Sequence, residues 1–331
     1  MEETAMKKGQ GILCCLLAAV LSMTLPACGK KNPETPGGST AAESRKLGVG
    51  CAAARTMDGT NKTVIKATAA AVELAADGTI AACRLDEVEF AVILTEGKPG
   101  DVAELRSKGE LGELYTLTEA DTGGKTEHAG TWRQQADAFC AYVKGKTAAE
   151  VSGIAATDGK NAEITGCDLV ITDFIKAVRQ AADHALAVKS GGGDTLHLAL
   201  LTQKNADSTD EKPHYDVEIA AVSMNGSKIT ACFTDTLQAK LTIENAMFST
   251  VSGEIETKRT IGDAYGMKKA SSIQKEWYEQ ADAFDVYAVG KTADELAAVK
   301  LGSDGKTDAI SGCTIEIGGM LEATVKAART A

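Results

Sequence analysis

The sequence predicts an α+β fold in which one module occurs twice, and three observations support this prediction. The first is an internal repeat: within 132–147, ten residues find the same residue 145 positions later. The second is that strand-like runs joined by a turn signal come early in each half of the chain. The third is that amphipathic helical patterns follow these runs. Strands followed by helices are typical of α+β domains rather than of doubly wound parallel sheets.

The boundaries of the two modules follow from the repeat and from one glycine-rich segment. The chain has 331 residues, which is enough for about two domains. We place the first module at 47–189 and the second at 195–331, and we refer to them below as the first half and the second half. The segment 190–194 contains three consecutive glycines. We expect it to be a linker that few contacts cross.

Each half is expected to open with a β-hairpin. Asp77-Gly78 separates two strand-like runs in the first half, and Asn225-Gly226 separates two in the second. Both dipeptides favour the tight turns that join antiparallel strands. The expected strands are 63–74 and 80–90 in the first half and 214–224 and 228–237 in the second. A further strand-like stretch is expected around 165–167 and again around 311–313.

Two helices are expected in each half. In the first, an apolar face recurs at helical spacing and Gly145 is placed to end the helix; Gly290 has the same position in the second. The residues of this face are Trp132, Ala136, Phe139 and Val143, and, in the second half, Trp277, Ala281, Phe284 and Ala288. A closing helix follows each later strand-like stretch, and Thr172 is expected to cap the first of them.

The N-terminus is predicted to be a targeting segment. Lys7 and Lys8 precede an apolar run at 11–25, which is too short for a typical transmembrane helix and fits a secretory signal. The run ends in Leu-Pro-Ala-Cys, which resembles a bacterial lipobox, so residues 1–28 are interpreted as a lipoprotein signal peptide. Cys28 would then carry the lipid, including palmitate, and anchor the protein to the membrane. An ordinary cleaved signal with a chance cysteine is the alternative. Residues 29–46 are expected to be a flexible tether.

Composition excludes some classes of partner. The net charge of -11 and the aromatic content of 4% argue against a nucleic-acid partner. No metal site is expected, because the four histidines have no partner at metal-ligand spacing. Six cysteines remain after the signal, and burial as small apolar side chains is the simplest expectation for most of them, although disulfides stay open in an exported protein.

One motif indicates a family. Ser311-Gly312-Cys313-Thr314 resembles the Ser-Gly-Ala-Thr motif of the FMN-binding domain family, which includes flavin subunits of Rnf-type and sodium-translocating NADH–quinone oxidoreductase complexes. The resemblance covers a hairpin, a helix ending in Gly-Lys-Thr, the motif and a closing helix. It implies two tandem FMN-binding-like modules, each a small antiparallel or mixed sheet with packed helices. In that family a threonine two residues after the motif is esterified through the FMN phosphate, beside a helix N-terminus that favours an anion.

The chain departs from this pattern at the acceptor threonine. That position is Glu316 in the second half and Val170 in the first, and neither side chain has the hydroxyl that an ester needs. The resemblance therefore implies, at most, non-covalent FMN binding. The candidate cofactor-binding residues are Ser311, Gly312, Cys313, Thr314 and Glu316, with Thr165, Gly166 and Cys167 as their first-half counterparts. Lys258 and Arg259 could meet a phosphate. The alternative is that Ser-Gly only makes a tight bend.

The sequence thus leads to two hypotheses of different class. One is an extracytoplasmic lipoprotein, lipid-anchored to the cell membrane, that holds flavin for electron transfer to a membrane partner. The other is a non-catalytic ligand- or protein-binding lipoprotein that kept the fold without the cofactor. Neither hypothesis gives the chain an independent catalytic activity.

Overall fold

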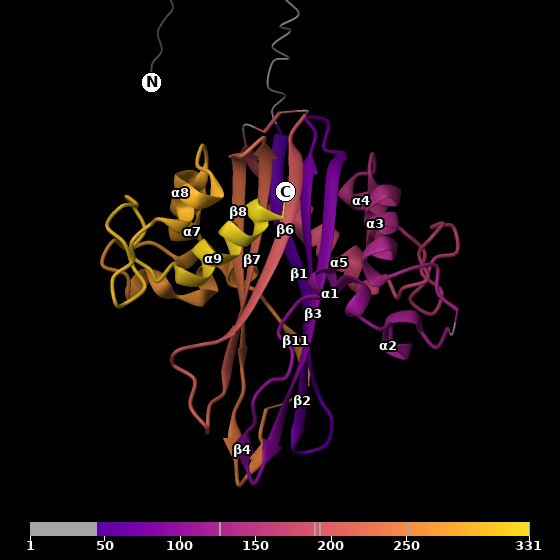
Figure 1. The fold of residues 1–331 in the computed structure, drawn as a ribbon, viewed down its shortest axis with the longest axis horizontal. Coiled ribbons are helices and arrows are strands. Elements are labelled where there is room, and N and C mark those ends of the chain that lie inside the picture. The colour runs from indigo at the N-terminus through magenta and orange to yellow at the C-terminus, as the bar shows by residue number, and fades with distance from the viewer. Residues whose placement is uncertain (1–44, 126, 189, 192, 251, 331) are drawn as a thin grey trace, which may run out of the picture. The chain divides into compact units, whose positions relative to one another are not determined.

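Two antiparallel sheets occupy the middle of the computed structural model, which describes residues 45–125, 127–188, 190–191, 193–250 and 252–330 (Figure 1). The predicted signal peptide, the predicted lipidation site Cys28 and nearly all of the expected tether lie outside the described residues. In the first sheet the strand order is β11-β1-β2-β3-β4, with β5 also paired to β1, and in the second it is β6-β7-β8. The strands of the first sheet are β1 (Arg45–Met57), β2 (Lys62–Leu74), β3 (Ile80–Thr95), β4 (Lys98–Pro99), β5 (Leu186–Val188) and β11 (Gly253–Ile255). Those of the second are β6 (Thr195–Lys204), β7 (His214–Asn225) and β8 (Lys228–Lys240), and a small hairpin consists of β9 (Ile243–Glu244) and β10 (Met247–Phe248).

The two expected hairpins are confirmed. β2 and β3 are joined through Gly78, which has a φ of 84°, and β7 and β8 through Gly226, which has a φ of 56°. Both angles lie in the left-handed region that glycine adopts without steric cost. Strands β1 and β6 were not expected. β1 pairs with β2 from Lys46 to Met57 and β6 pairs with β7 along its whole length, so each sheet has one more long strand than the turn signals indicate.

Helices cover the outer faces of both sheets. The predicted helices are present as α3 (Trp132–Val143) and α7 (Trp277–Ala288), and the closing helices as α5 (Thr172–His184) and α9 (Gly318–Arg329). Thr172 does not cap α5: the N-cap residue is Ile171, without a side-chain hydrogen bond, and Thr172 is the first helical residue. The shorter helices are α1 (Lys108–Leu111), α2 (Glu119–Thr122), α4 (Ala148–Ser152), α6 (Lys258–Ile261), α8 (Ala293–Ala297), and the 3₁₀ turns η1 (Gly112–Leu114), η2 (Gly262–Tyr265) and η3 (Met267–Lys269).

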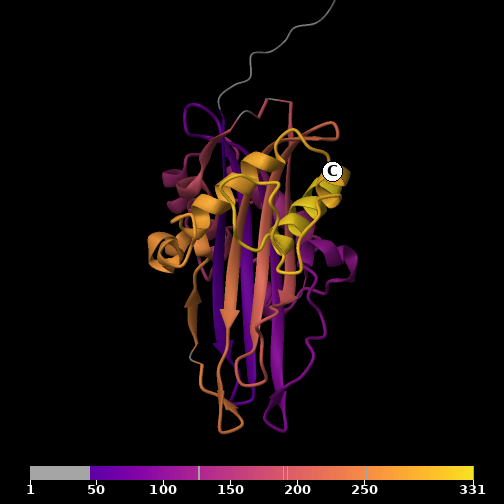
Figure 2. The same ribbon diagram turned by 90° about the vertical axis from the view of Figure 1, so that its left-hand side faces the viewer.

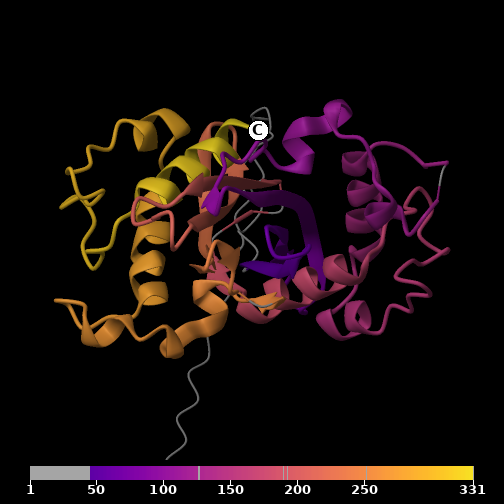
Figure 3. The ribbon, with the colours of Figure 1, turned by 90° about the horizontal axis from the view of Figure 1, so that it is seen from below.

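Residues 45–330 are thus arranged as helices, sheet, sheet and helices (Figures 2 and 3). Alternate residues of each strand point to opposite faces. The inner faces of the two sheets form one apolar core, in which Phe90 of the first sheet contacts Tyr215 of the second with ring centroids 5.3 Å apart. The outer faces form two further cores with their helices, one centred on Trp132, Phe139 and Phe174 and the other on Trp277 and Phe284. The α+β class is confirmed.

The sharing of the inner core overturns one expectation. We expected few contacts across 190–194, but β11 of the second half pairs with β1 of the first, and the sheets of both halves bury the same apolar surface. Both ends of the segment also contact the rest of the protein: Ser190 is buried, and the Asp194 carboxylate accepts hydrogen bonds from the Asn225 amide and the Thr230 hydroxyl. At the other boundary, β1 includes Arg45 and Lys46, the last two residues of the expected tether.

Two glycines set the distance between β1 and α5. A Cβ atom on Gly48 would lie 2.0 Å from the carbonyl oxygen of Ala181, and one on Gly50 would lie 2.2 Å from that of Ala177. The strand backbone therefore contacts the helix backbone with no side chain between them. This close approach is why α5 can cover both β1 and β2.

The stretches around 165–167 and 311–313 are not strands, so that prediction is wrong. Gly166 and Gly312 both have a φ of 82°, which reverses the chain. The Cys167 N–H donates to the Ile164 carbonyl, which closes a tight turn, and Cys313 does the same with Ile310. Ile164 and Cys167, and likewise Ile310 and Cys313, are buried at the two ends of these turns.

Candidate functional site

A cavity of about 490 Å³ lies beside the Ser-Gly-Cys-Thr loop of the second half. Three parts of the chain line it: α6 together with η3 and the residues just after η3, the first turn of α7, and the loop that precedes α9. The lining side chains that bear on chemistry are Lys258, Ser271, Trp277, Lys306, Thr314 and Glu316. With Ser272, the cavity therefore combines two ammonium groups, three hydroxyls and one carboxylate in a protein whose net charge is negative.

The loop residues predicted for this site divide into two groups. Thr314 and Glu316 line the cavity and are exposed to it. Ser311, Gly312 and Cys313 do not line it: the Ser311 side chain is exposed, Gly312 makes the turn, and the Cys313 thiol is buried in the core. The alternative that Ser-Gly makes a tight bend is therefore what the backbone shows at these three residues.

Gln280 fixes Thr314 at the edge of the cavity. Its side-chain oxygen accepts hydrogen bonds from the Thr314 N–H at 2.8 Å and from the Thr314 hydroxyl at 3.0 Å. Gln280 is buried on α7 and its amide nitrogen donates to the Ser271 hydroxyl at 3.2 Å. Because α7 is packed against the sheet, this glutamine ties two walls of the cavity to a rigid element.

Lys258 carries a charge that is partly buried and lies against aromatic rings. Its ammonium group lies 4.9 Å from the ring centroid of Trp277 and 5.7 Å from that of Tyr265, so two aromatic faces stabilise it. Burial lowers the pKa of Lys258 from its ordinary value. Within the described residues no carboxylate oxygen lies at ion-pair distance from this ammonium group. Its positive charge is balanced by aromatic rings and by more distant acids.

Trp277 is a core residue, as its helical spacing predicted. Only 3% of its surface is exposed, and the Lys258 ammonium group lies over its ring. A flavin ring therefore has no free tryptophan face on which to stack in this arrangement. Trp132 is buried in the same way in the first half, where its ring packs edge-on against Phe174.

Arg259 does not face the cavity, and the expectation that it could meet a phosphate is wrong. Its guanidinium group is buried and forms ion pairs with Asp282 at 2.7 Å and Asp285 at 2.8 Å. Its Nε donates to the Thr234 carbonyl. Because helix α6 turns successive side chains by about 100°, Lys258 and Arg259 point to different surroundings although they are neighbours in sequence.

Sequence reasoning missed Glu218, a buried carboxyl on β7 near Lys258. It accepts a hydrogen bond of 2.6 Å from the Thr236 hydroxyl of β8. Burial raises the pKa of Glu218 to about 7, although the charge of Lys258 acts in the opposite direction. An acidic residue inside the run Val217-Glu218-Ile219-Ala220 was the available signal, because a charge within a strand buried on both faces requires an explanation.

The corresponding loop residues of the first half have different surroundings. Thr165 is exposed, Gly166 makes the turn, and Cys167 is buried. Asp168 takes the place of Thr314: its N–H donates to Gln135 at 2.7 Å, and its carboxylate pairs with Lys125. The backbone of the loop is therefore repeated, while the side chains around it are not.

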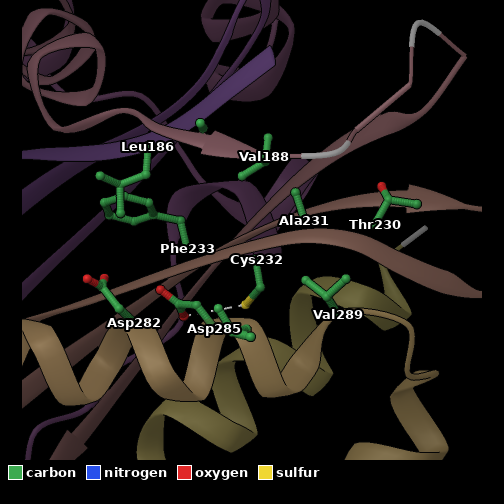
Figure 4. A pocket seen from close by; sticks show the side chains of 11 residues that line it. Leu186, Val188, Thr230, Ala231, Cys232, Phe233, Asp282, Asp285 and Val289 are labelled. Atoms are coloured by element: carbon green, nitrogen blue, oxygen red, sulfur yellow. Dashed lines mark hydrogen bonds between the residues drawn. The ribbon is translucent and has the colours of Figure 1, made fainter. Parts of the chain in front are cut away.

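A second cavity, of about 400 Å³, lies between β5, β8 and α7 (Figure 4). The exposed apolar side chains Leu186, Val286 and Val289 surround its opening. Asp285 lies on its helical wall, 3.6 Å from the Cys232 thiol, and is paired with the buried Arg259. This cavity can admit an apolar group, but its two acids are already neutralised by the arginine.

The six cysteines of the described residues are free and buried. No group of three metal-ligating side chains is found in this part of the chain, and none of its helices has the length and apolarity needed to cross a membrane. The expectation that no metal is bound stays a prediction.

Comparison with known proteins gives limited information. No family model matches the chain, and no solved structure matches it. A chlorophenol reductase of Desulfitobacterium hafniense is 49% identical over 41 residues. This stretch is 12% of the present chain and 12% of the reductase, so the chain matches only a small part of that curated relative's length.

Proposed function

We propose that this chain is an extracytoplasmic lipoprotein with two tandem FMN-binding-like modules, and that the second half binds FMN non-covalently for electron transfer near the membrane. The cavity beside Thr314 is the observation on which this proposal depends, because it combines Lys258 and Lys306 with the loop that resembles the family motif. Both halves contain a β-hairpin followed by short helices, a long helix and a closing helix, and left-handed glycines match at Gly78 and Gly226 and at Gly166 and Gly312, which supports the tandem modules. The short match to a protein named as a reductase is compatible with a redox role.

The flavin would supply the redox chemistry, and the protein would hold and orient it. Thr314 and Ser271 offer hydroxyls, and the two lysines offer positive charge to the phosphate. Glu316 opposes binding, since its carboxylate lies in the same cavity as the phosphate would. No covalent flavin is expected, because Glu316 and Val170 have no hydroxyl at the acceptor position.

Replacement of Glu316 tests the flavin proposal. We expect Glu316→Thr to tighten FMN binding by about tenfold, because removal of a like charge near a phosphate is worth on the order of 1 kcal/mol at an exposed position. Quenching of flavin fluorescence in a titration measures this. Glu113→Thr, at an exposed position in η1, is the matched control and should change nothing. Mass spectrometry of the denatured protein should find no attached flavin. If neither protein binds FMN at millimolar concentration, the flavin proposal is wrong.

The alternative function, a non-catalytic binding lipoprotein, is favoured by one observation. Lys258 covers the ring of Trp277, so the cavity has no free tryptophan face for a flavin. The absorption spectrum of the protein purified from its own cell separates the two functions: flavin bands support electron transfer, and their absence supports the alternative.

The proposed membrane localisation is tested by substitution of Cys28. If the cysteine carries lipid, Cys28→Ala should move the protein from the membrane fraction to the soluble or secreted fraction. Detergent-phase partitioning of the variant and the native protein measures this. The lipid anchor is refuted if the two proteins partition alike.

A further inference from the structure

The two halves differ in length beside the cavity. Between Tyr115 and Thr131 the first half has 15 residues, whereas between Tyr265 and Glu276 the second has 10. The longer segment contains helix α2, which Figure 1 shows beside the other helices of the first half. The shorter segment contains only the turn η3. Segment 266–275 therefore has no counterpart of helix α2.

In the first half, a carboxylate of helix α2 contacts a lysine that occurs at the same position in both halves. Asp121 forms a short, buried ion pair with Lys108. The same carboxylate accepts a hydrogen bond of 2.7 Å from the Tyr115 hydroxyl, and others from the N–H and the hydroxyl of Thr118. Lys108 and Tyr115 have the same residue types as Lys258 and Tyr265, 150 positions later. The contact between Lys108 and Asp121 therefore shows how a lysine at this position binds an anion.

The backbone of α2 satisfies two more donors. The Asp121 carbonyl accepts from the Val170 N–H at 2.7 Å, and the Thr122 carbonyl accepts from the Lys160 ammonium group at 2.9 Å. Thr122 is fully buried as a result. Three donors from separate parts of the first half thus converge on two residues of one short helix.

The counterparts of these three donors in the second half all line the cavity. They are the Lys258 ammonium group, the backbone of Glu316 and the Lys306 ammonium group. Across the residues that the structure describes, the Glu316 N–H and the Lys258 ammonium group have no hydrogen-bond acceptor, and Lys306 pairs only with Asp304 at 3.5 Å on its own exposed turn. The cavity therefore has the donors of the first half without the helix that satisfies them there.

We propose that the second half binds a small molecule through its carboxylate or phosphate group, that this group contacts Lys258 as Asp121 contacts Lys108, and that the first half is closed to such a ligand by α2. Acceptor oxygens of the same molecule would take the hydrogen bonds of the Glu316 N–H and of Lys306. One ligand should bind per chain. The inference rests on the proposed function in taking this cavity as the ligand site, but it does not require the ligand to be a flavin.

The acids around Lys258 do not replace Asp121. In the first half Lys108 also contacts Glu87 on β3 at 2.5 Å. The residue of β8 at the position of Glu87 is Thr236, and the carboxyl of the second half is instead Glu218 on β7, which bonds to that threonine and not to the lysine. An incoming anion would therefore find the lysine without a contacting acid.

The test measures binding of inorganic phosphate, acetate, FMN and riboflavin to the full chain in detergent by calorimetry. Lys258→Met should weaken binding of phosphate or acetate, and of FMN, by about tenfold or more. Riboflavin, which lacks the phosphate, should be unaffected by the substitution. Lys268→Met removes an equal charge at an exposed position in η3 and should leave every affinity unchanged within about twofold. The preference between phosphate and acetate identifies the class of anion.

A second variant keeps the test decisive if Lys258→Met does not fold. Replacement of 266–275 by the first-half segment 116–130 should supply α2 and abolish binding in a folded protein. Binding of phosphate or acetate without FMN would support the anion site and refute the flavin function. FMN binding that survives both variants would support the flavin function and overturn the anion site. If no probe binds the native chain, both proposals are wrong.

Discussion

Substitution of Gly50 by alanine should lower the free energy of unfolding by about 3 kcal/mol or more, the upper part of the range for overpacked cores. A Cβ atom at this position would lie 2.2 Å from the Ala177 carbonyl oxygen and 2.3 Å from the Ala181 N atom of α5. Both are backbone atoms, so relief requires a shift of the helix rather than of a side chain. Urea denaturation followed by circular dichroism measures the change, and Gly48→Ala combined with Gly50→Ala should prevent folding.

The control for this prediction is Gly253 on β11. A Cβ atom there would meet nothing within 4 Å, and its φ is not positive. Gly253→Ala should therefore change stability by no more than about 0.5 kcal/mol, as at other surface positions. Equal effects at Gly50 and Gly253 would show that the contact between β1 and α5 is looser than described.

The second large effect expected is a pH dependence from Glu218. Its pKa rises on folding from 4.5 to about 7. The folded protein therefore holds a proton that the unfolded chain releases, and the resulting stabilisation is fully present below pH 4.5 and lost as the pH rises through about 7. The shift corresponds to about 3 kcal/mol of unfolding free energy, because one pKa unit is worth about 1.4 kcal/mol.

Glu218→Gln isolates this contribution. The amide is neutral at every pH, so the variant and the native protein should have similar stability near pH 4.5, and the variant should be more stable by up to about 3 kcal/mol near pH 8. Urea unfolding at the two pH values measures the difference. Glu256→Gln, at an exposed position, should show no such divergence. Parallel stability curves for Glu218→Gln and the native protein would contradict the assigned protonation.

The hairpins and the long helices were predictable from sequence because their signals are local. Asp77-Gly78 and Asn225-Gly226 specify turns through their own backbone preferences, whatever packs around them. Helices α3 and α7 have apolar residues at helical spacing and a glycine just after the last turn. These features depend only on neighbours along the chain.

The missed strands have a different cause. β1 lies in a sheet that is covered on both faces, so residues 47–54 are a continuous run of apolar residues and glycine instead of alternating with polar ones. The sharing of one core by the two sheets is a non-local property and no turn signal encodes it. The loops at Gly166 and Gly312 were assigned as strands because their apolar residues are short runs, and such runs do not distinguish strand from buried turn.

The candidate site was predictable in part. Lys258, Thr314 and Glu316 were identified from the motif and line the cavity. The inward orientation of Arg259 depends on two aspartates that α7 brings from more than 20 residues away in the sequence. The contrast between a filled first half and an open second half depends on what the short helix α2 contacts, and the length difference alone could not have shown that.

The inner core also bears on how this chain could have arisen. Each sheet has one face covered by its own helices and the other covered only by the opposite half. A protein with a single such unit would have exposed that apolar face to water, and a second copy of itself is the simplest cover for it. The present chain supplies that cover within one polypeptide, because the inner faces of its two sheets bury each other.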